Sequence, residues 1–183
     1  MGLDDAPFRF TDSHVAVYGA LVRCPNYLEA VLRTTVAVDG LDATEKVISL
    51  VKGSRHRESI QLILIDGISF GGFNVLDVEA LFDGLRLPVA TVTRDPPDFP
   101  AMRRALRGRF SDFQERLRRL ENLPLVKVPT AHKPVYCGAL GISPPELREA
   151  LKLCTVRGAL PEPLRIAHLI GAGVVRGESR GRP

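Results

Sequence analysis

One apolar run, residues 60–65, ends at an acidic residue, Asp66, and this pattern constrains the fold more than any other in the chain. A strand that is apolar at nearly every position has both faces buried, which is typical of parallel strands inside an α/β sheet. Helices must then cover both faces. In open α/β sheets ligands gather at the carboxyl ends of such strands, so the polar pair Asp66 and Gly67 is predicted to lie where a ligand binds.

The remaining pattern predicts a mixed sheet flanked by helices. Residues 15–24 and 28–38 predict two strands joined by a short turn, which is an antiparallel hairpin. A second buried strand is predicted at 88–92, connected to the first by a helix over 75–85 in a right-handed crossover. We also expect helices at 44–51, 106–120, 143–154 and from 161 onward, and short strands at 125–128 and 134–137.

Length and composition favour one globular domain. A chain of 183 residues fits a single domain over residues 1–175, followed by a flexible basic tail at 176–183. No apolar run approaches the roughly 18 residues of a membrane span, and no secretory signal is visible, so we expect a cytoplasmic protein without a membrane partner. The three cysteines, Cys24, Cys137 and Cys154, are far apart and odd in number, which predicts reduced core residues.

Several aspartates follow predicted strands. Asp66 ends the central strand, Asp39 and Asp42 follow the hairpin, and a short N-terminal strand would add Asp4 or Asp5. Because adjacent strand residues face opposite sides, we expect at most one of the last two to point into a cluster. Clustered carboxylates need a cation, and all-carboxylate sites favour Mg²⁺ or Mn²⁺. The alternative is structural, since aspartate is common in turns and at helix N-termini.

One histidine and a set of arginines also have two interpretations. His168 lies among apolar residues of the last predicted helix, so it is either a core side chain or a ligand, if that helix faces the carboxylates. The predicted helix at 106–120 and the residues just before it carry arginines, which form either a solvated face or a track for phosphates. These are Arg103, Arg104, Arg107, Arg109, Arg116, Arg118 and Arg119. The net charge of +4 permits a polyanionic partner without requiring one.

Taken in order, five segments resemble the successive motifs of endonuclease V. They are Gly2-Leu3-Asp4, Ile65-Asp66-Gly67, Leu87-Pro88-Val89, Lys133-Pro134-Val135-Tyr136 and Leu160-Pro161-Glu162-Pro163-Leu164-Arg165-Ile166-Ala167-His168. Residues 2–8, 38–44 and 66–75 are similar to an archaeal relative of that family, the endonuclease dU family. This resemblance implies a ribonuclease-H-like fold and metal-dependent nicking of DNA near a deaminated base, deoxyuridine rather than deoxyinosine.

The resemblance also implies a site, residue by residue. Asp4 matches the metal aspartate of the first strand, Asp66 matches the one that ends the central strand, and His168 matches a His or Asp near the metal. The relatives' glutamate has no direct counterpart, and we assign its place to Asp42, ahead of Asp39 and Glu45. The expected ligands of Mg²⁺ or Mn²⁺ are therefore Asp4, Asp42 and Asp66, with His168 transferring a proton or orienting the metal.

Three basic residues are expected to contact nucleic acid: Arg94, Lys133 and Arg165. Arg94 stands where endonuclease V has a lysine near its metal. The chain departs from endonuclease V in one respect, since residues 39–44 replace the tyrosine-bearing loop that probes the damaged base. Recognition of the base therefore does not transfer from those relatives. Only three residues precede Asp4, so we expect a very short first strand or a start further upstream.

These features predict an endonuclease of DNA repair that acts on damaged, uracil-containing DNA as a monomer or weak dimer. Two alternatives remain. One is a catalytically weak nucleic-acid-binding module of the same fold, and the other is a phosphoesterase of small nucleotides, which a closed pocket would favour. In a metal site the carboxylates should converge within about 4–6 Å of one another.

Overall fold

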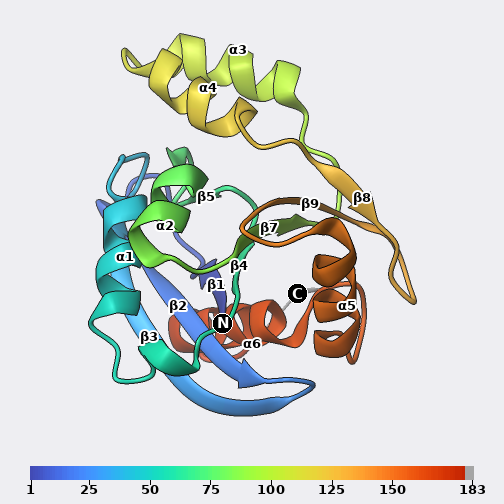
Figure 1. Ribbon diagram of the computed structural model, residues 1–183. Coiled ribbons are helices and arrows are strands. Elements are labelled where there is room, and N and C mark those ends of the chain that lie inside the picture. Colours follow the sequence, from blue (N-terminus) through green and yellow to red (C-terminus); the bar gives the residue numbers. More distant parts are fainter. Residues whose placement is uncertain (180–183) are drawn as a thin grey trace.

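The computed structural model describes residues 1–179 and contains a seven-stranded mixed sheet with helices on both faces (Figure 1). The strands of this sheet are β1 (Gly2–Asp5), β2 (His14–Arg23), β3 (Tyr27–Ala37), β4 (Ile63–Asp66), β7 (Val89–Thr93), β8 (Val126–Val128) and β9 (Val135–Leu140). The helices are α1 (Ala43–Lys52), α2 (Val78–Leu85), α3 (Phe99–Arg109), α4 (Phe113–Glu121), α5 (Pro144–Cys154) and α6 (Glu162–Arg176), with a short 3₁₀ helix at Arg57–Ser59. A separate ribbon pairs β5 (Ser69–Phe70) with β6 (Asn74–Val75).

The strand order is β3-β2-β1-β4-β7-β9-β8. Three neighbouring strands at the centre, β1, β4 and β7, are parallel. The long β2–β3 hairpin adds antiparallel strands on one side, and β9 and β8 add antiparallel strands on the other. The expected mixed sheet, with an antiparallel hairpin beside parallel strands, is confirmed.

The central strand β4 is buried on both faces, as its apolar run predicts. Ile63 and Ile65 pack into the core beneath α1 and α2, whereas Leu64 packs with α5 and α6 on the opposite face. All three side chains are almost fully buried, and each such burial contributes about 1.5–3 kcal/mol. The alternation continues past the core, so it also decides which way Asp66 points.

Helix α5 begins as its sequence predicts. The Ser143 side chain accepts a hydrogen bond from the Glu146 backbone N–H, and the Glu146 carboxylate accepts one from the Ser143 N–H, which together form a capping box with Pro144 at the first helical position. Leu147 and Leu151 on the inner face of α5 then pack against the sheet.

The prediction of a single long helix at 106–120 is wrong, because the chain forms two helices there. α3 and α4 are connected by a turn in which Phe110 adopts an extended backbone, and they lie together above the sheet (Figure 1, yellow-green and yellow). Leu106 of α3 and Leu120 of α4 are buried together with Val75. The apolar residues of this segment, which recur at spacings of three and four, therefore line the inside of a helical hairpin.

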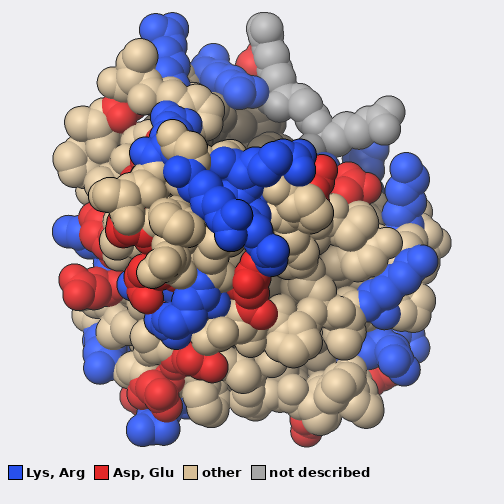
Figure 2. Space-filling model, turned by 90° about the horizontal axis from the view of Figure 1, so that it is seen from above, with Lys and Arg blue, Asp and Glu red and all other residues tan. Residues whose placement is uncertain are grey.

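Most of the arginines on this hairpin are held by carboxylates. Five of the seven form ion pairs: Arg103, Arg109, Arg116, Arg118 and Arg119. Figure 2, which views the molecule from the side of α3 and α4, shows basic side chains gathered in a band with acidic ones beside it. Arg116 is buried and donates to the backbone carbonyls of Gly40 and Phe73, so it attaches α4 to two loops.

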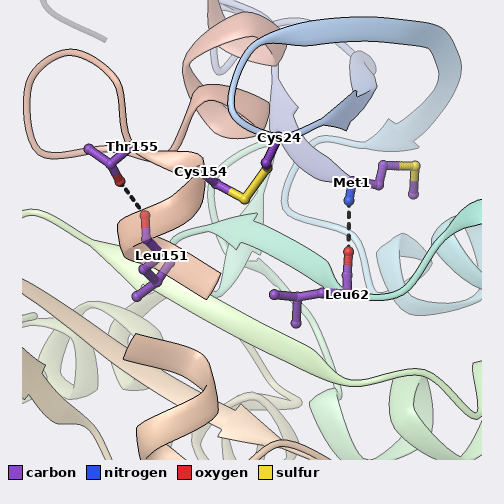
Figure 3. The surroundings of a disulfide bond; sticks show 6 residues. All are labelled: Met1, Cys24, Leu62, Leu151, Cys154 and Thr155. Atoms are coloured by element: carbon purple, nitrogen blue, oxygen red, sulfur yellow. Dashed lines mark hydrogen bonds between the residues drawn. A yellow bond between two sulfur atoms is a disulfide. The ribbon is translucent and has the colours of Figure 1, made fainter. Parts of the chain in front are cut away.

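Two of the three cysteines form a disulfide, so the prediction that all three are reduced is wrong for Cys24 and Cys154 (Figure 3). Cys24 follows β2 and Cys154 ends α5, at a sequence separation of 130 residues. The fold brings their Cα atoms to 5.0 Å, a proximity that no local pattern predicts. Cys137 is free and buried in the core, as expected.

The last helix extends into the predicted tail. α6 is 15 residues long, reaches Arg176 and ends at Gly177, whose positive φ of 79° forms the C-cap. The remainder of the predicted basic tail from residue 180 lies outside the described residues. Among residues 1–179, no helix has the length and apolar character needed to cross a membrane.

Candidate carboxylate site at the end of the central strands

Strand pairing brings Asp4 and Asp66 together. In the parallel β1–β4 pair, Leu3 is opposite Ile65, and each strand continues with an aspartate. Leu3 and Ile65 face the core beneath α1 and α2. Because side chains alternate along a strand, Asp4 and Asp66 face the opposite side, where α6 packs. Both lie at the carboxyl ends of parallel strands, the position predicted for a ligand site.

His168 of α6 faces this pair. Its Nδ1 lies 2.9 Å from Oδ2 of Asp4, and the two side chains are 28% and 8% exposed. The hydrogen bond to Asp4 raises the pKa of His168 above its usual value, with the charges of Asp4 and Asp66 acting in the same direction. The helix that carries His168 therefore faces the carboxylates, which is the condition under which His168 is expected to act at the site.

Asp5 also borders the site, although we expected at most one of the two N-terminal aspartates to do so. It points to the other side of β1, as alternation requires, and its Oδ2 accepts a 2.6 Å hydrogen bond from the backbone N–H of Gly71. Burial raises the pKa of Asp5 to about 6. Strand β1 ends at Asp5, so both aspartates lie at the edge of the sheet. Side chains that point to opposite faces of the strand can therefore line the same pocket.

The carboxylates line a pocket of about 440 Å³ together with basic side chains. Its lining residues are Asp4, Asp5, Ala6, Pro7, Phe8, Asp66, Arg94, His168 and Arg176. Arg94 and Arg176 are exposed, so the pocket opens to solvent. It is thus an acidic depression with cations at its border.

Asp66 is the most perturbed carboxyl group of the site. Burial raises its pKa to about 7, the charges of Asp4 and Asp5 act in the same direction, and those of Arg94 and His168 oppose them. Near neutral pH the carboxyl is therefore divided between its protonated and ionised forms. A cation in the pocket would favour the ionised form.

The three candidates for the remaining ligand lie elsewhere. Asp42 precedes α1, and its Oδ1 accepts hydrogen bonds from the Ala37 N–H and from Nδ2 of Asn74. Asp39 pairs with Arg109, and Glu45 is exposed on α1. None of the three borders the pocket, because the segment between β3 and α1 lies on the face covered by α1 and α2. Asp42 therefore lies outside the pocket that Asp4, Asp5 and Asp66 line.

The three predicted nucleic-acid contacts border one neighbouring cavity. Arg94, Lys133 and Arg165 all line a space of about 770 Å³, and Arg94 also borders the carboxylate pocket. Arg165, however, forms an ion pair with the buried Glu162, its Nη2 lying 2.6 Å from Oε2. Its charge is thus neutralised within α6.

The donor set fits a hard divalent cation. In the part of the chain that the structure describes, no three His, Cys, Asp or Glu side chains form a ready-made cage for a metal ion. Mg²⁺ does not need one, since it keeps several waters and binds through one or two carboxylates plus substrate phosphates. Asp4 and Asp66 offer two such carboxylates. Burial, and after it the charge of Asp4, raises the pKa of Asp66, and a bound cation would favour its ionised form.

Stability measured without metal tests this electrostatic account. Because the folded-state pKa of Asp66 exceeds its unfolded value, ionised Asp66 destabilises the fold as pH rises from about 4 to 7. In EDTA, Asp66→Asn is therefore expected to have a higher free energy of unfolding than the native chain. This gain in stability should be larger at pH 8 than at pH 5 by on the order of 2 kcal/mol. Urea unfolding at the two pH values measures this difference.

Other titratable groups contribute equally to the pH dependence of stability in the native chain and in Asp66→Asn, so their contributions cancel when the two proteins are compared. The Met1 amine, whose pKa burial lowers to about 5, acts with the opposite sign, but it is present in both proteins and cancels. A gain in stability that is equal at both pH values would contradict the raised pKa of Asp66.

Known proteins similar to this chain agree with the motifs described above. A family model described as endonuclease dU matches residues 1–175. A UPF0215 protein of Methanothermobacter thermautotrophicus is 43% identical over 99% of this chain and 89% of its own length. Another UPF0215 protein, from Methanosarcina mazei, is 38% identical over 100% of this chain and 93% of its own length.

Solved structures share the fold. A protein of unknown function from Archaeoglobus fulgidus superimposes with a TM-score of 0.87 at 33% identity, covering 96% of this chain and 97% of that one. Human ENDOV does so with a TM-score of 0.63 at 14% identity, covering 96% and 83%. Endonuclease V of Ciona intestinalis, solved with DNA containing an inosine, has a TM-score of 0.58 at 15% identity, covering 91% and 81%. At such low identity these last two show the fold alone. With a family match over nearly its whole length, this chain belongs to the endonuclease dU family, a family of nucleases.

Proposed function

We propose that this chain is a divalent-metal-dependent endonuclease of DNA repair that nicks DNA near deoxyuridine. The observation that carries the proposal is that Asp4 and Asp66 follow paired residues at the carboxyl ends of two parallel strands and line one pocket, with His168 hydrogen-bonded to Asp4. Membership of the endonuclease dU family supports deoxyuridine as the lesion. The open carboxylate pocket favours a polymeric substrate over a small nucleotide.

Each residue of the site has a role in this proposal. Asp4 and Asp66 would hold Mg²⁺ or Mn²⁺, which when bound supplies a Lewis acid for phosphodiester hydrolysis. His168 keeps the Asp4 carboxylate oriented through its hydrogen bond and, with its raised pKa, can donate a proton near neutral pH. Asp5 fixes the following loop through the Gly71 N–H. Arg94 adds positive charge beside Asp66, where a phosphate would bind.

A second, smaller pocket is suited to a nucleobase. It has a volume of about 230 Å³ and begins at Gly67, directly after Asp66. Phe99 and Met102 of α3 supply apolar surface, and Thr91 and Thr93 of β7 also line the pocket. The Thr91 hydroxyl is bonded to the backbone of Gly138, and the Thr93 hydroxyl donates to the Asp95 carbonyl and can still accept a hydrogen bond. Enzymes that examine a base in DNA take it out of the stack into an apolar pocket with a few polar groups. In this proposal the α3–α4 hairpin forms one wall of the pocket that reads the lesion.

Cleavage of defined substrates tests the function. Labelled duplexes that contain one deoxyuridine, one deoxyinosine, one abasic site or no lesion would be incubated with the protein in Mg²⁺, Mn²⁺ or EDTA. We expect nicking of the deoxyuridine strand with either metal, at least about tenfold faster than for the undamaged duplex, and none in EDTA. Binding without nicking under every condition would instead support a nucleic-acid-binding module. Nicking in EDTA would contradict the metal dependence.

A further inference from the structure

A basic cavity adjoins the carboxylate pocket on the side of β8 and β9. It is formed by the end of β7, the loop between β8 and β9, the loop between α5 and α6, and α6 itself. Its volume of about 770 Å³ exceeds that of the carboxylate pocket. Its polar lining residues are Arg94, Asp95, His132, Lys133, Arg157 and Arg165.

The charges around this cavity favour an anion. Arg94, Lys133 and Arg157 are exposed cations, and Asp95 is the one carboxylate among the lining residues. The Arg165 charge is already balanced by Glu162, and Arg94 also interacts with Asp66, so Lys133 and Arg157 are the cations that distinguish this cavity from the carboxylate pocket. His132 adds positive charge when it is protonated.

The loop that carries His132 and Lys133 is closed by its own hydrogen bonds. Thr130 Oγ1 donates to the Lys133 carbonyl at 2.7 Å and accepts from the His132 N–H at 3.0 Å. Directly after this turn, Val135 of β9 is buried in the core. Lys133 is thus held near the cavity by a defined turn, which lowers the entropy lost when it binds a ligand.

The two spaces share one residue, Arg94, which borders both the carboxylate pocket and the basic cavity. A single small anion can occupy only one of them. An extended chain of phosphates can present one phosphodiester to the carboxylates while the next lies among Lys133 and Arg157. The arrangement therefore selects for a polynucleotide.

We infer that the basic cavity binds a phosphate of the nucleic-acid strand next to the phosphodiester in the carboxylate pocket, through Lys133 and Arg157 with His132 at its edge. The inference rests on the proposed nuclease function and extends it in two ways. It adds Arg157 to the contacts expected from the sequence, and it removes Arg165, whose partner is Glu162.

Binding measured without divalent metal tests the inference separately from catalysis. A fluorescent single strand and its duplex, both undamaged, would be titrated in EDTA across a range of NaCl concentrations with Lys133→Ala/Arg157→Ala. Loss of the one phosphate contact that Lys133 and Arg157 share should reduce the slope of log affinity against log salt by about 0.7–0.9 in the double variant. Its affinity at low salt should fall at least about tenfold.

The matched control is Arg33→Ala/Lys46→Ala, which removes the same two residue types from exposed positions on β3 and α1. Strand β3 is at the opposite edge of the sheet from β8. The control is expected to bind as the native chain does. Equal losses in both double variants would mean that only net charge matters, and an unchanged affinity of Lys133→Ala/Arg157→Ala would also overturn the inference.

Two further results separate the possible ligands. If dUMP competes as strongly as the oligonucleotide at the same concentration of phosphate, the cavity is a mononucleotide site. That result would contradict a strand-binding role. If the native chain nicks no substrate but the double variant alone loses affinity, the nuclease proposal fails while the cavity stands. If the native chain nicks DNA and the double variant binds normally, the cavity inference fails alone.

Discussion

Replacing Asp66 by asparagine is expected to lower the rate of nicking of a deoxyuridine-containing duplex by about a thousandfold or more. Asparagine has the same shape but lacks the negative charge that the proposed cation requires, and loss of about 4 kcal/mol of transition-state stabilisation corresponds to that factor. Single-turnover cleavage in Mg²⁺ measures the effect directly. The variant should remain folded, because removal of a buried charge with a raised pKa relieves repulsion from Asp4 and Asp5.

Asp42→Asn is the matched control for this experiment. It makes the same chemical change at a residue that the sequence alone favoured as a ligand, but whose Oδ1 accepts hydrogen bonds from Ala37 and Asn74. We expect its rate of nicking to stay within about threefold of the native rate at a temperature where it is folded. If Asp42→Asn abolished cleavage and Asp66→Asn did not, the site would lie near α1 and the present assignment would be wrong.

Loss of the Cys24–Cys154 disulfide is expected to lower the free energy of unfolding by about 3–5 kcal/mol. The bond closes a loop of more than a hundred residues, and a crosslink of that length strongly restricts the unfolded chain. It also joins the turn of the β2–β3 hairpin to the end of α5 (Figure 3), and residues of both parts line one pocket. Urea unfolding of Cys24→Ser/Cys154→Ser measures the effect.

The reducing agent dithiothreitol provides the control for this prediction. It should destabilise the native chain to the level of the double serine variant and leave that variant unchanged, since Cys137 is free in both. If the native chain in oxidising buffer were no more stable than the double variant, the disulfide would contribute nothing to folding.

Much of the fold follows from local pattern. The continuous apolar run of β4 predicted a strand buried on both faces, and residues 15–24 and 28–38 predicted the hairpin that β2 and β3 form. The helix predicted over residues 143–154 is α5, which begins with a capping box at Ser143. These features are local because each depends on residues that lie within a few positions of one another.

The failures have a common physical origin in distant contacts. A helical hairpin and one long helix show the same three-to-four spacing of apolar residues, so the break at Phe110 was not predicted. The disulfide joins residues 130 positions apart. Asp42 follows a strand, as a ligand would, but the connection to α1 turns it to the wrong face. The position of Asp5 beside the site could have been predicted, because Asp5 adjoins Asp4 at the end of a very short strand.

The central claim is that Asp4 and Asp66 together hold a divalent metal ion. Anomalous diffraction from crystals soaked in Mn²⁺ tests it most directly, because the signal locates the ion without any assumption about substrate. We predict one strong peak in direct contact with carboxylate oxygens of both Asp4 and Asp66, which is absent from crystals of Asp66→Asn. A peak beside Asp42 or Asp39, or no peak between Asp4 and Asp66 in crystals of a protein that nicks DNA in Mn²⁺, would contradict the claim.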